Sequence, residues 1–173
     1  MRSTAMTILH SIEVKGSDLV ALSLEEVSDR LLIADLYARY VHHADTSNIK
    51  GLDEVFEPKA VLDYSAAGAA VTTWDQARDT PLIRGELFWR VHHIYTNFLI
   101  VFDKGSDAAK VAMKVFCPAA TAPGEQGVVT EMLGTYDDEV VKDDQGWRIR
   151  HRHWNPWWIS QGQTVQPELN FDL

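Results

Sequence analysis

Six of the seven histidines in the chain stand in three close sets, His42-His43, His92-His93 and His151-x-His153. Each set lies beside a segment that the hydrophobic pattern predicts to be buried. Imidazole takes up and returns a proton readily near neutral pH, so this clustering favours general acid–base chemistry. The sequence therefore predicts a proton-transfer site built from at least one of the three sets.

A carboxylate stands where the sequence predicts an apolar residue. An apolar stripe recurs in steps of three and four and is expected to face the core; its members are Leu24, Val27, Leu31, Ala34, Ala38 and Val41. The next step falls on Asp45, whose desolvation would be unfavourable by several kcal/mol unless it had a partner. A histidine that donates one ring nitrogen to Asp45 would keep the other as a base. The sequence leaves open which histidine this is, and the alternative is that Asp45 caps the following helix.

Two helices are expected to position these residues. The first begins at Ser23, whose hydroxyl can cap the backbone while Glu26 reaches back to it. The second spans 49–56, and Pro58 stops it. Because the first helix ends near Asp45, it would carry that carboxylate to the site.

Strands dominate the rest of the chain. They are expected over 60–65, 93–102, 109–116, 127–141 and 147–154. The stretch 66–90 is expected to hold helix pieces with a loop, because Thr73-Trp-Asp-Gln76 resembles a capping box and Pro81 suits a first helical turn. The connections within 103–146 are rich in turn formers, which predicts a mostly antiparallel sheet. The fold class is α+β, with helices covering one face of a bent sheet to form a cup.

Composition narrows the classes of partner. The chain has 25 acidic and 16 basic residues and a formal charge of -9, so its field repels nucleic acid and anionic membranes. Its single cysteine, Cys117, is expected to be a core thiol. The N-terminus lacks signal-peptide features, so a cytoplasmic location is expected. One domain is expected over 23–155, after a mobile extension at 1–22 and before a tail at 156–173.

Four stretches resemble a known family. They are Ile33-Ala-Asp-Leu-Tyr37-x-x-Tyr40-x-x-x-x-Asp45, His93-Ile-Tyr-Thr-Asn97, Gly134-x-Tyr136-x-Asp138 and Gly146-Trp147-Arg-Ile149-x-x-Arg152. Together they resemble the SnoaL-like branch of the nuclear transport factor 2-like superfamily, over about 23–152. The pattern is similar to lindane dehydrochlorinase and bile acid 7α-dehydratase, and more distantly to scytalone dehydratase. The resemblance implies a cone-shaped, cystatin-like cup and an elimination reaction without a cofactor.

The resemblance also implies a role for each of four residues. In the two nearer enzymes an Asp on the first helix pairs with a His 48 positions on, and Asp45 and His93 have this spacing. His93 would be the base that removes a proton next to an activating group, and Asp45 its orienting partner. Tyr40 would lie across the pocket as a hydrogen-bond donor. Arg152 would stabilise a developing anion.

Strand alternation bears on Arg152. It predicts two opposite faces in the last strand, one with Arg148, Arg150 and Arg152 and the other with Trp147, Ile149, His151 and His153. Not all of these polar residues can point inward. We expect Arg152 in the pocket, and the alternative is a surface arginine.

A metal site is the rival use of these histidines. Two histidines and a carboxylate can bind iron or zinc. However, adjacent residues on a strand, such as His92 and His93, point to opposite faces, and no His-Glu-x-x-His or Cys-x-x-Cys spacing occurs. We therefore expect neither a metal nor another cofactor.

Aromatic residues indicate a medium-sized, largely apolar substrate that is cyclic or aromatic. The residues expected to bind it are His42, Tyr64, Trp74, Trp89, Tyr95, Phe116, Trp154, Trp157 and Trp158. Because Pro156 cannot continue a central strand, the segment 154–159 is expected to fold over the cup mouth or against a neighbouring subunit. This favours a homo-oligomer, either dimer or trimer.

The function predicted from these residues is a cofactor-independent dehydration or related β-elimination. The same residues could return the proton to a ketone, so a ketosteroid-type isomerase or a polyketide cyclase is the near alternative. A non-catalytic binding module is the alternative from another class, since related cups serve as small subunits of ring-hydroxylating dioxygenases.

Overall fold

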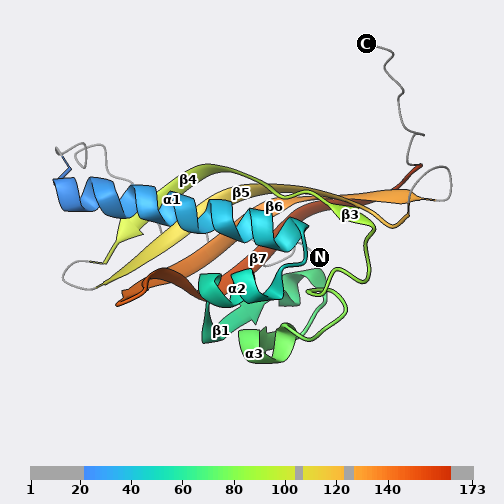
Figure 1. Ribbon diagram of the computed structural model, residues 1–173. Coiled ribbons are helices and arrows are strands. Elements are labelled where there is room, and N and C mark those ends of the chain that lie inside the picture. The colour runs from blue at the N-terminus through green and yellow to red at the C-terminus, as the bar shows by residue number, and fades with distance from the viewer. Residues whose placement is uncertain (1–21, 104–106, 123–126, 165–173) are drawn as a thin grey trace, which may run out of the picture.

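The computed structural model of the protein describes residues 22–103, 107–122 and 127–164 (Figure 1). Most of the expected N-terminal extension, and the tail from residue 165 on, lie outside the described residues. The elements in chain order are α1 (Leu24–Asp45), α2 (Ile49–Val55), β1 (Phe56–Asp63), the 3₁₀ turn η3 (Ser65–Ala67), β2 (Val71–Thr73), α3 (Trp74–Ala77), β3 (Arg90–Val91), β4 (Ile94–Phe102), β5 (Ala108–Ala120), β6 (Val128–Asp143) and β7 (Gly146–Thr164). No helix among the described residues is both long and apolar enough to span a membrane.

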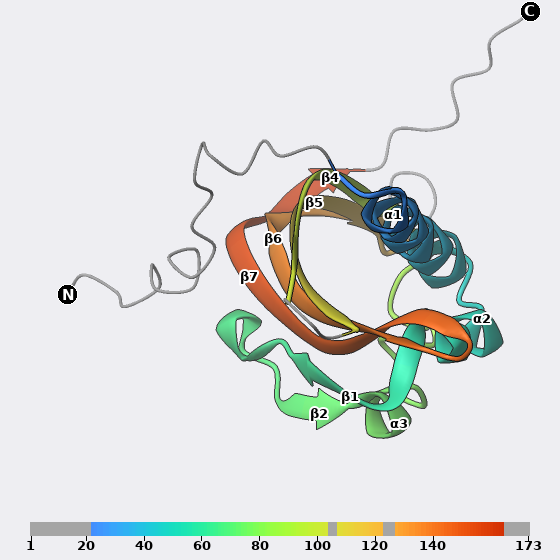
Figure 2. The ribbon, with the colours of Figure 1, turned by 90° about the vertical axis from the view of Figure 1, so that its left-hand side faces the viewer.

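One curled sheet forms the body of the molecule. Its strand order is β2-β1-β7-β6-β5-β3, and β4 pairs with β5 beside β3. Every pairing is antiparallel except that of β1 with β7, which is parallel. The sheet curls into a half-barrel, and α1 and α2 lie along its hollow side (Figure 2). The expected α+β cup is confirmed.

Local sequence signals explain the helix ends. The Ser23 hydroxyl accepts from the Glu26 amide at 3.1 Å, as expected for the start of α1. Asn48 caps α2 by accepting from the Gly51 amide. The capping box at Thr73 begins α3, but no helix follows Pro81. The short strand β2 was not expected, because three residues carry too little periodicity to reveal a strand.

The buried face of α1 differs from the expected one. Leu24 and Leu31 of the predicted stripe are 90% and 67% exposed, and Ala34 and Ala38 are exposed as well. The face that packs on the sheet carries Ile33, Leu36, Tyr37 and Tyr40 instead. This helix is apolar on two sides, and the side with the bulkier rings is buried because burying rings removes more apolar surface from water. Asp45 nevertheless faces the sheet from the end of the helix.

A β-bulge decides where Arg152 points. The pairing of β6 with β7 shifts between Val140↔Ile149 and Glu139↔His151, which leaves Arg150 as the extra residue. The bulge reverses the alternation of faces, so Arg152 points inward like Ile149 although the two are three positions apart. The expected division of β7 into two constant faces was therefore wrong. Arg152 is fully buried, so the alternative of a surface arginine is wrong.

The predicted end of the last strand was also wrong, since β7 continues through Pro156 to Thr164. The parallel pairing of β1 with β7 stops at His153. Beyond that point β7 is an edge strand, where a proline interrupts no second ladder of hydrogen bonds. The expected domain boundary at 155 thus falls inside β7.

A buried ion pair lies in the hollow of the sheet. The Arg152 guanidinium is fully buried and donates from Nη2 to Asp138 Oδ2 at 2.8 Å and from Nε to both carboxylate oxygens at 3.2 Å. The Tyr37 hydroxyl donates to the same carboxylate at 3.0 Å, which joins α1 to the pair. Burial disfavours the charge of Arg152, but the Asp138 carboxylate and the surrounding tyrosine hydroxyls together outweigh this effect and hold the pKa of Arg152 above its ordinary value. The interior therefore contains a fixed positive group.

Replacing Asp138 by Asn would leave Arg152 buried without a counter-ion. We expect this change to lower the free energy of unfolding by about 3 kcal/mol or more. The matched control is Arg150→Gln, on the same strand as Arg152. It removes the half-exposed ion pair between Arg150 and Glu57 of β1 and should lower the free energy of unfolding by less than about 1 kcal/mol. Urea unfolding measures both, and equal losses would contradict the structural role given to the buried pair.

A second carboxylate ties the start of α1 to the β6–β7 hairpin. Asp29 accepts from Lys142 Nζ at 2.8 Å and from Trp147 Nε1 at 3.0 Å. Burial raises the pKa of Asp29, but the two hydrogen bonds and the charge of Lys142 together outweigh burial and leave this pKa below its ordinary value of 3.8. Folding therefore favours the ionised form of Asp29. The stability that the ionised carboxylate gives to the folded protein is present above about pH 4 and is lost as the pH falls below it.

We expect Asp29→Asn to lower the free energy of unfolding at pH 7 by about 1–2 kcal/mol, because the hydrogen bonds lose their charged acceptor. The difference between the two proteins should stay constant from pH 7 to pH 5. It should then shrink as the pH falls below about 4, because the unfolded chain binds a proton at Asp29 at a higher pH than the folded protein does. Denaturant titrations at these pH values test the expectation, and an undiminished difference at pH 3 would contradict it.

Candidate active site

Four elements bring the ionisable and aromatic residues together on the hollow side of the sheet. The end of α1 supplies Tyr40 and Asp45, and the junction between β3 and β4 supplies His93. Tyr95 follows on β4, and Arg152 comes from β7. These residues are distant in sequence and meet only because the sheet curls around α1.

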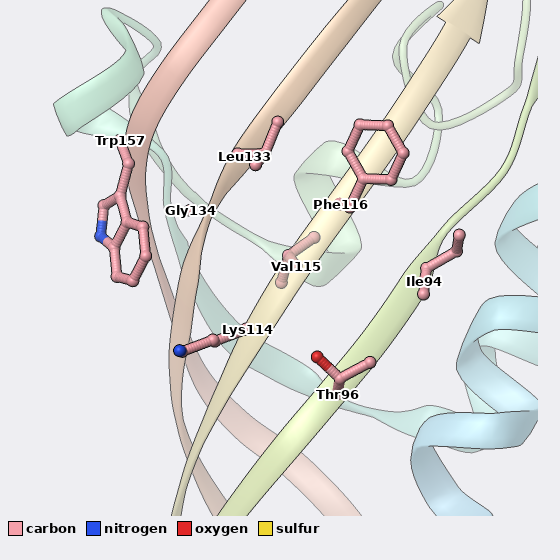
Figure 3. Close-up of a pocket in the computed structure, with 8 residues that line it drawn as sticks. All are labelled: Ile94, Thr96, Lys114, Val115, Phe116, Leu133, Gly134 and Trp157. Carbon is pink, nitrogen blue, oxygen red and sulfur yellow. The ribbon is translucent and has the colours of Figure 1, made fainter.

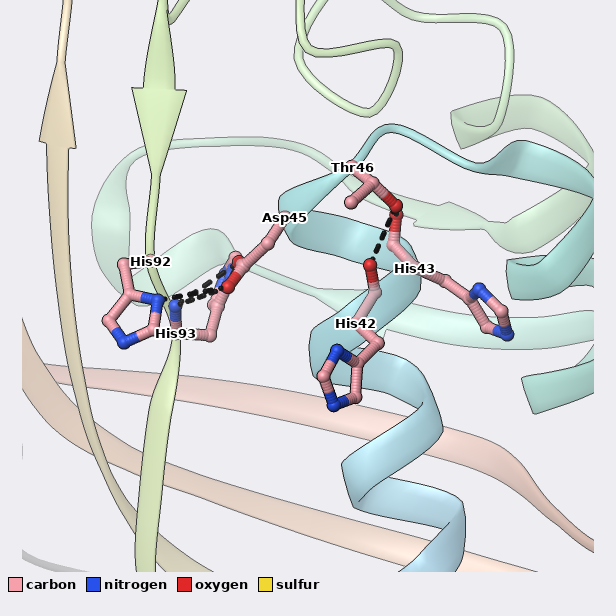
Figure 4. A network of polar contacts seen from close by, with 6 residues as sticks. All are labelled: His42, His43, Asp45, Thr46, His92 and His93. Atoms are coloured by element: carbon pink, nitrogen blue, oxygen red, sulfur yellow. Dashed lines mark hydrogen bonds and ion pairs between the residues drawn. The ribbon is translucent and has the colours of Figure 1, made fainter.

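Asp45 and His93 form a hydrogen-bonded pair, as expected (Figure 4). His93 Nδ1 lies 2.6 Å from Asp45 Oδ1, and the His93 backbone amide donates to both carboxylate oxygens at 3.1 and 3.2 Å. An ionised carboxylate only accepts, so His93 Nδ1 is the donor, and in the neutral ring Nε2 keeps its lone pair. The two side chains are 13% and 16% exposed, so the pair is sheltered but reachable from solvent.

His92 contacts the same carboxylate. Its Nδ1 lies 3.3 Å from Asp45 Oδ2, and the side chain is 68% exposed. The expectation that His92 and His93 point to opposite faces was wrong, because both residues lie in the break between β3 and β4. The His92 amide there donates to the Pro118 carbonyl while the His93 amide turns to Asp45. This break in the strand lets two adjacent rings approach one carboxylate.

Tyrosine rings enclose His93 on its inner side. The rings of Tyr40 and Tyr95 meet the imidazole edge-on with centroids 5.8 and 6.0 Å away, and they stack on each other at 5.6 Å. Tyr136 meets Tyr95 at 5.7 Å. Burial raises the pKa of all three phenols, so they are neutral near pH 7 and available as hydrogen-bond donors.

Arg152 lies behind these rings. Its guanidinium carbon is 4.3 Å from the centroid of Tyr40 and 4.2 Å from that of Tyr136. Two of its nitrogens are occupied by Asp138, whereas Nη1 is buried and forms no hydrogen bond with the residues that the structure describes. The positive group thus contacts the tyrosine that contacts His93.

Of the other residues expected to bind substrate, the structure brings Tyr64 and Trp154 into this aromatic group, since both rings contact Tyr136, at 6.2 and 4.9 Å. Trp74 is buried deeper, stacked on Phe56, and donates to Asp53. The structure therefore extends the aromatic wall but places Trp74 in the supporting core.

Four expected residues lie elsewhere. Phe116 and Trp157 line a pocket of about 220 Å³ on the outer face of the sheet (Figure 3). Strand alternation is the reason, because the buried Val115 and Cys117 flank Phe116 on β5. Trp158 and Trp89 are exposed, and Trp89 stacks under the Arg90 guanidinium.

His42 is exposed on the last turn of α1, and its carbonyl accepts from the Thr46 hydroxyl at 2.7 Å. Its neighbour His43 packs against Gly51, where an added Cβ would lie 2.4 Å from the ring. The first histidine set therefore contributes to the junction between α1 and α2, and Asp45 is the residue of this stretch that reaches His93.

Sequence reasoning missed three residues of this arrangement. Tyr136 and Asp138 stood in the quoted motif, but no role was given to them, and the contact of His92 was excluded. The signal for Asp138 was that the residues two positions before and after it on the same face of the strand, Tyr136 and Val140, are apolar, since a carboxylate on a buried face requires a partner. No signal in the sequence reveals the break between β3 and β4.

Cys117 is buried as expected, and burial raises the pKa of its thiol to about 12. Within residues 22–103, 107–122 and 127–164, no group of three or more His, Cys, Asp or Glu side chains is placed to hold a metal ion.

Comparisons with known proteins identify the family. The chain is 33% identical over 132 residues to the uncharacterized protein Rv2910c of Mycobacterium tuberculosis, which covers 76% of this chain and 87% of the relative. Its fold is similar to that of the hexachlorocyclohexane dehydrochlorinase LinA-type3 from Novosphingobium barchaimii, with a TM-score of 0.69, 14% identity and coverage of 83% and 96% of the two chains. The fold is also similar to that of a protein of Novosphingobium aromaticivorans that is provisionally named scytalone dehydratase. The TM-score is 0.67 and the identity 21%, and the match covers 82% of this chain and 93% of the other. The SnoaL-like domain matches residues 25–153, so the chain belongs to the SnoaL-like domain family.

Proposed function

We propose that the protein is a cofactor-independent lyase that forms a carbon–carbon double bond by dehydration or a related β-elimination. The observation that carries the proposal is the 2.6 Å bond between His93 Nδ1 and Asp45 Oδ1. This bond fixes the ring orientation and leaves Nε2 as the basic atom. A base held in one tautomer is what removal of a proton from carbon requires.

The proposed reaction begins with proton transfer from a substrate carbon to His93 Nε2. The C–H electrons form the new double bond as the bond from the neighbouring carbon to the leaving group breaks. Asp45 balances the positive charge that His93 acquires. The proton on Nε2 leaves with the departing group, as water or as an acid, which restores neutral His93.

Tyr40 is proposed as the hydrogen-bond donor for the substrate carbonyl or the leaving group. Its phenol is neutral, because burial raises its pKa, and its ring contacts His93. The guanidinium of Arg152 lies 4.3 Å from the ring centroid and makes the phenol a better donor by its positive charge. Since Asp138 already neutralises most of that charge, we assign Arg152 mainly this supporting role.

The aromatic wall supports a flat or cyclic, largely apolar substrate. Tyr40, Tyr95, Tyr136 and Trp154 form a continuous chain of ring contacts from His93 to β7. The names of two structural relatives, a hexachlorocyclohexane dehydrochlorinase and a provisional scytalone dehydratase, refer to cyclic substrates as well. The proposed class is therefore cyclic β-hydroxy ketones and related ring compounds with a leaving group next to an acidic C–H.

The test is turnover of a panel of cyclic β-hydroxy ketones and chlorinated cyclohexanes, followed by ultraviolet absorbance of the conjugated product and by chloride release. We expect His93→Gln to lower kcat/KM by about 10²–10⁴, the usual contribution of a general base. Asp45→Asn should also lower kcat/KM, because an amide nitrogen at this position favours the other His93 tautomer. His151→Gln, on the outer part of β7, is the matched histidine control.

Reaction in D₂O separates the alternatives. A lyase releases the leaving group, whereas an isomerase or cyclase would incorporate deuterium or rearrange the substrate without releasing it. If His93→Gln turned over as fast as His151→Gln while both proteins remained folded by circular dichroism, the proposed function would be wrong.

A further inference from the structure

An exposed histidine shares the Asp45 carboxylate with the proposed base. His93 Nδ1 contacts Oδ1 at 2.6 Å from the sheltered side, and His92 Nδ1 contacts Oδ2 at 3.3 Å from the solvent side. Backbone hydrogen bonds fix both residues, from the His92 amide to the Pro118 carbonyl and from the His93 amide to Asp45. Figure 4 shows both rings turned toward the carboxylate, with His42 and His43 turned away from it.

One carboxylate cannot fully balance two imidazolium rings. A proton on His92 is attracted by the Asp45 carboxylate and repels a proton on His93. The two rings therefore bind their protons as a coupled pair. The other titratable groups facing this pair are uncharged near pH 7, because burial raises the pKa of Tyr40, Tyr95 and Cys117. Asp138 balances the charge of Arg152 on β7. The guanidinium of Arg90 on β3 stacks on the ring of Trp89.

We propose that His92 is a positioning residue that sets the lower pH limit of proton abstraction by His93, because a proton on His92 opposes the binding of a proton to His93 at their shared carboxylate. This inference rests on the proposed function for its consequence in catalysis. The coupling itself is a property of the folded protein and does not depend on any substrate. His92 is suited to the role because its exposed ring exchanges protons directly with solvent.

The first experiment is an NMR titration of the full chain labelled at histidine carbon Cε1. In His92→Gln we expect the titration midpoint of His93 to rise by about 0.5–1 pH unit, the effect of removing a like charge on the other side of an accessible carboxylate. His92→Lys, which keeps a positive charge at all relevant pH values, should move the midpoint in the opposite direction. His151→Gln is the matched control and should leave it in place.

Coupling is reciprocal, which gives an internal check. His93→Gln should shift the titration of His92 by the same amount as His92→Gln shifts that of His93. An unchanged His93 titration in His92→Gln, or the same shift in His92→Gln and His92→Lys, would overturn the proposal. The second result would indicate a purely structural contact.

The second experiment is the pH profile of kcat/KM once a substrate is found. The acidic limb should move to higher pH in His92→Gln by the shift seen in the titration, with the plateau value retained. A changed plateau with an unmoved limb would overturn the role in catalysis. Coupled titrations without turnover of any substrate would count against the proposed function and leave the coupling established, so the two failures are distinguishable.

Discussion

The interior of this protein is organised by the need to stabilise a fully buried arginine. An unpaired guanidinium would be strongly unfavourable inside a protein, and Asp138 meets this need with three hydrogen-bond contacts to Arg152. The aromatic rings of Tyr40 and Tyr136 cover the faces that remain. Because Tyr37 also donates to Asp138, the same pair fixes the height and rotation of α1 over the sheet.

That constraint places the candidate site. Once the Tyr37 and Tyr40 face of α1 is turned to the sheet, the end of the helix carries Asp45 to the break between β3 and β4. His93 then lies between a carboxylate and two neutral phenols, which together fix the orientation of its ring. A continuous line of contacts leads from the buried cation through Tyr40 and His93 to Asp45, and on to His92 at the surface.

The sequence predicted the elements that have strong local signals. Local signals specify the boundaries of several elements, such as the Ser23 cap, the Thr73 capping box and the alternation of the strands. The spacing of Asp45 and His93 indicated that the two residues pair. The buried face of α1 could not be predicted from periodicity, because apolar residues line two sides and tertiary contacts of Tyr37 and Tyr40 decide between them. The bulge at Arg150 was equally hidden, since it depends on how β6 and β7 pair. The outer-face positions of Phe116 and Trp157 show that an aromatic residue near a site in sequence can lie on the wrong side of a strand.

The role given to Asp45 is to hold the His93 ring in the tautomer with hydrogen on Nδ1. Nitrogen-15 NMR of the histidine-labelled protein at a pH where His93 is neutral measures this directly, because protonated and unprotonated ring nitrogens differ widely in chemical shift. The structure predicts a protonated Nδ1 and an unprotonated Nε2 for His93, with this preference lost in Asp45→Asn. A neutral His93 that carries its proton on Nε2 in the wild-type protein would contradict this role of Asp45.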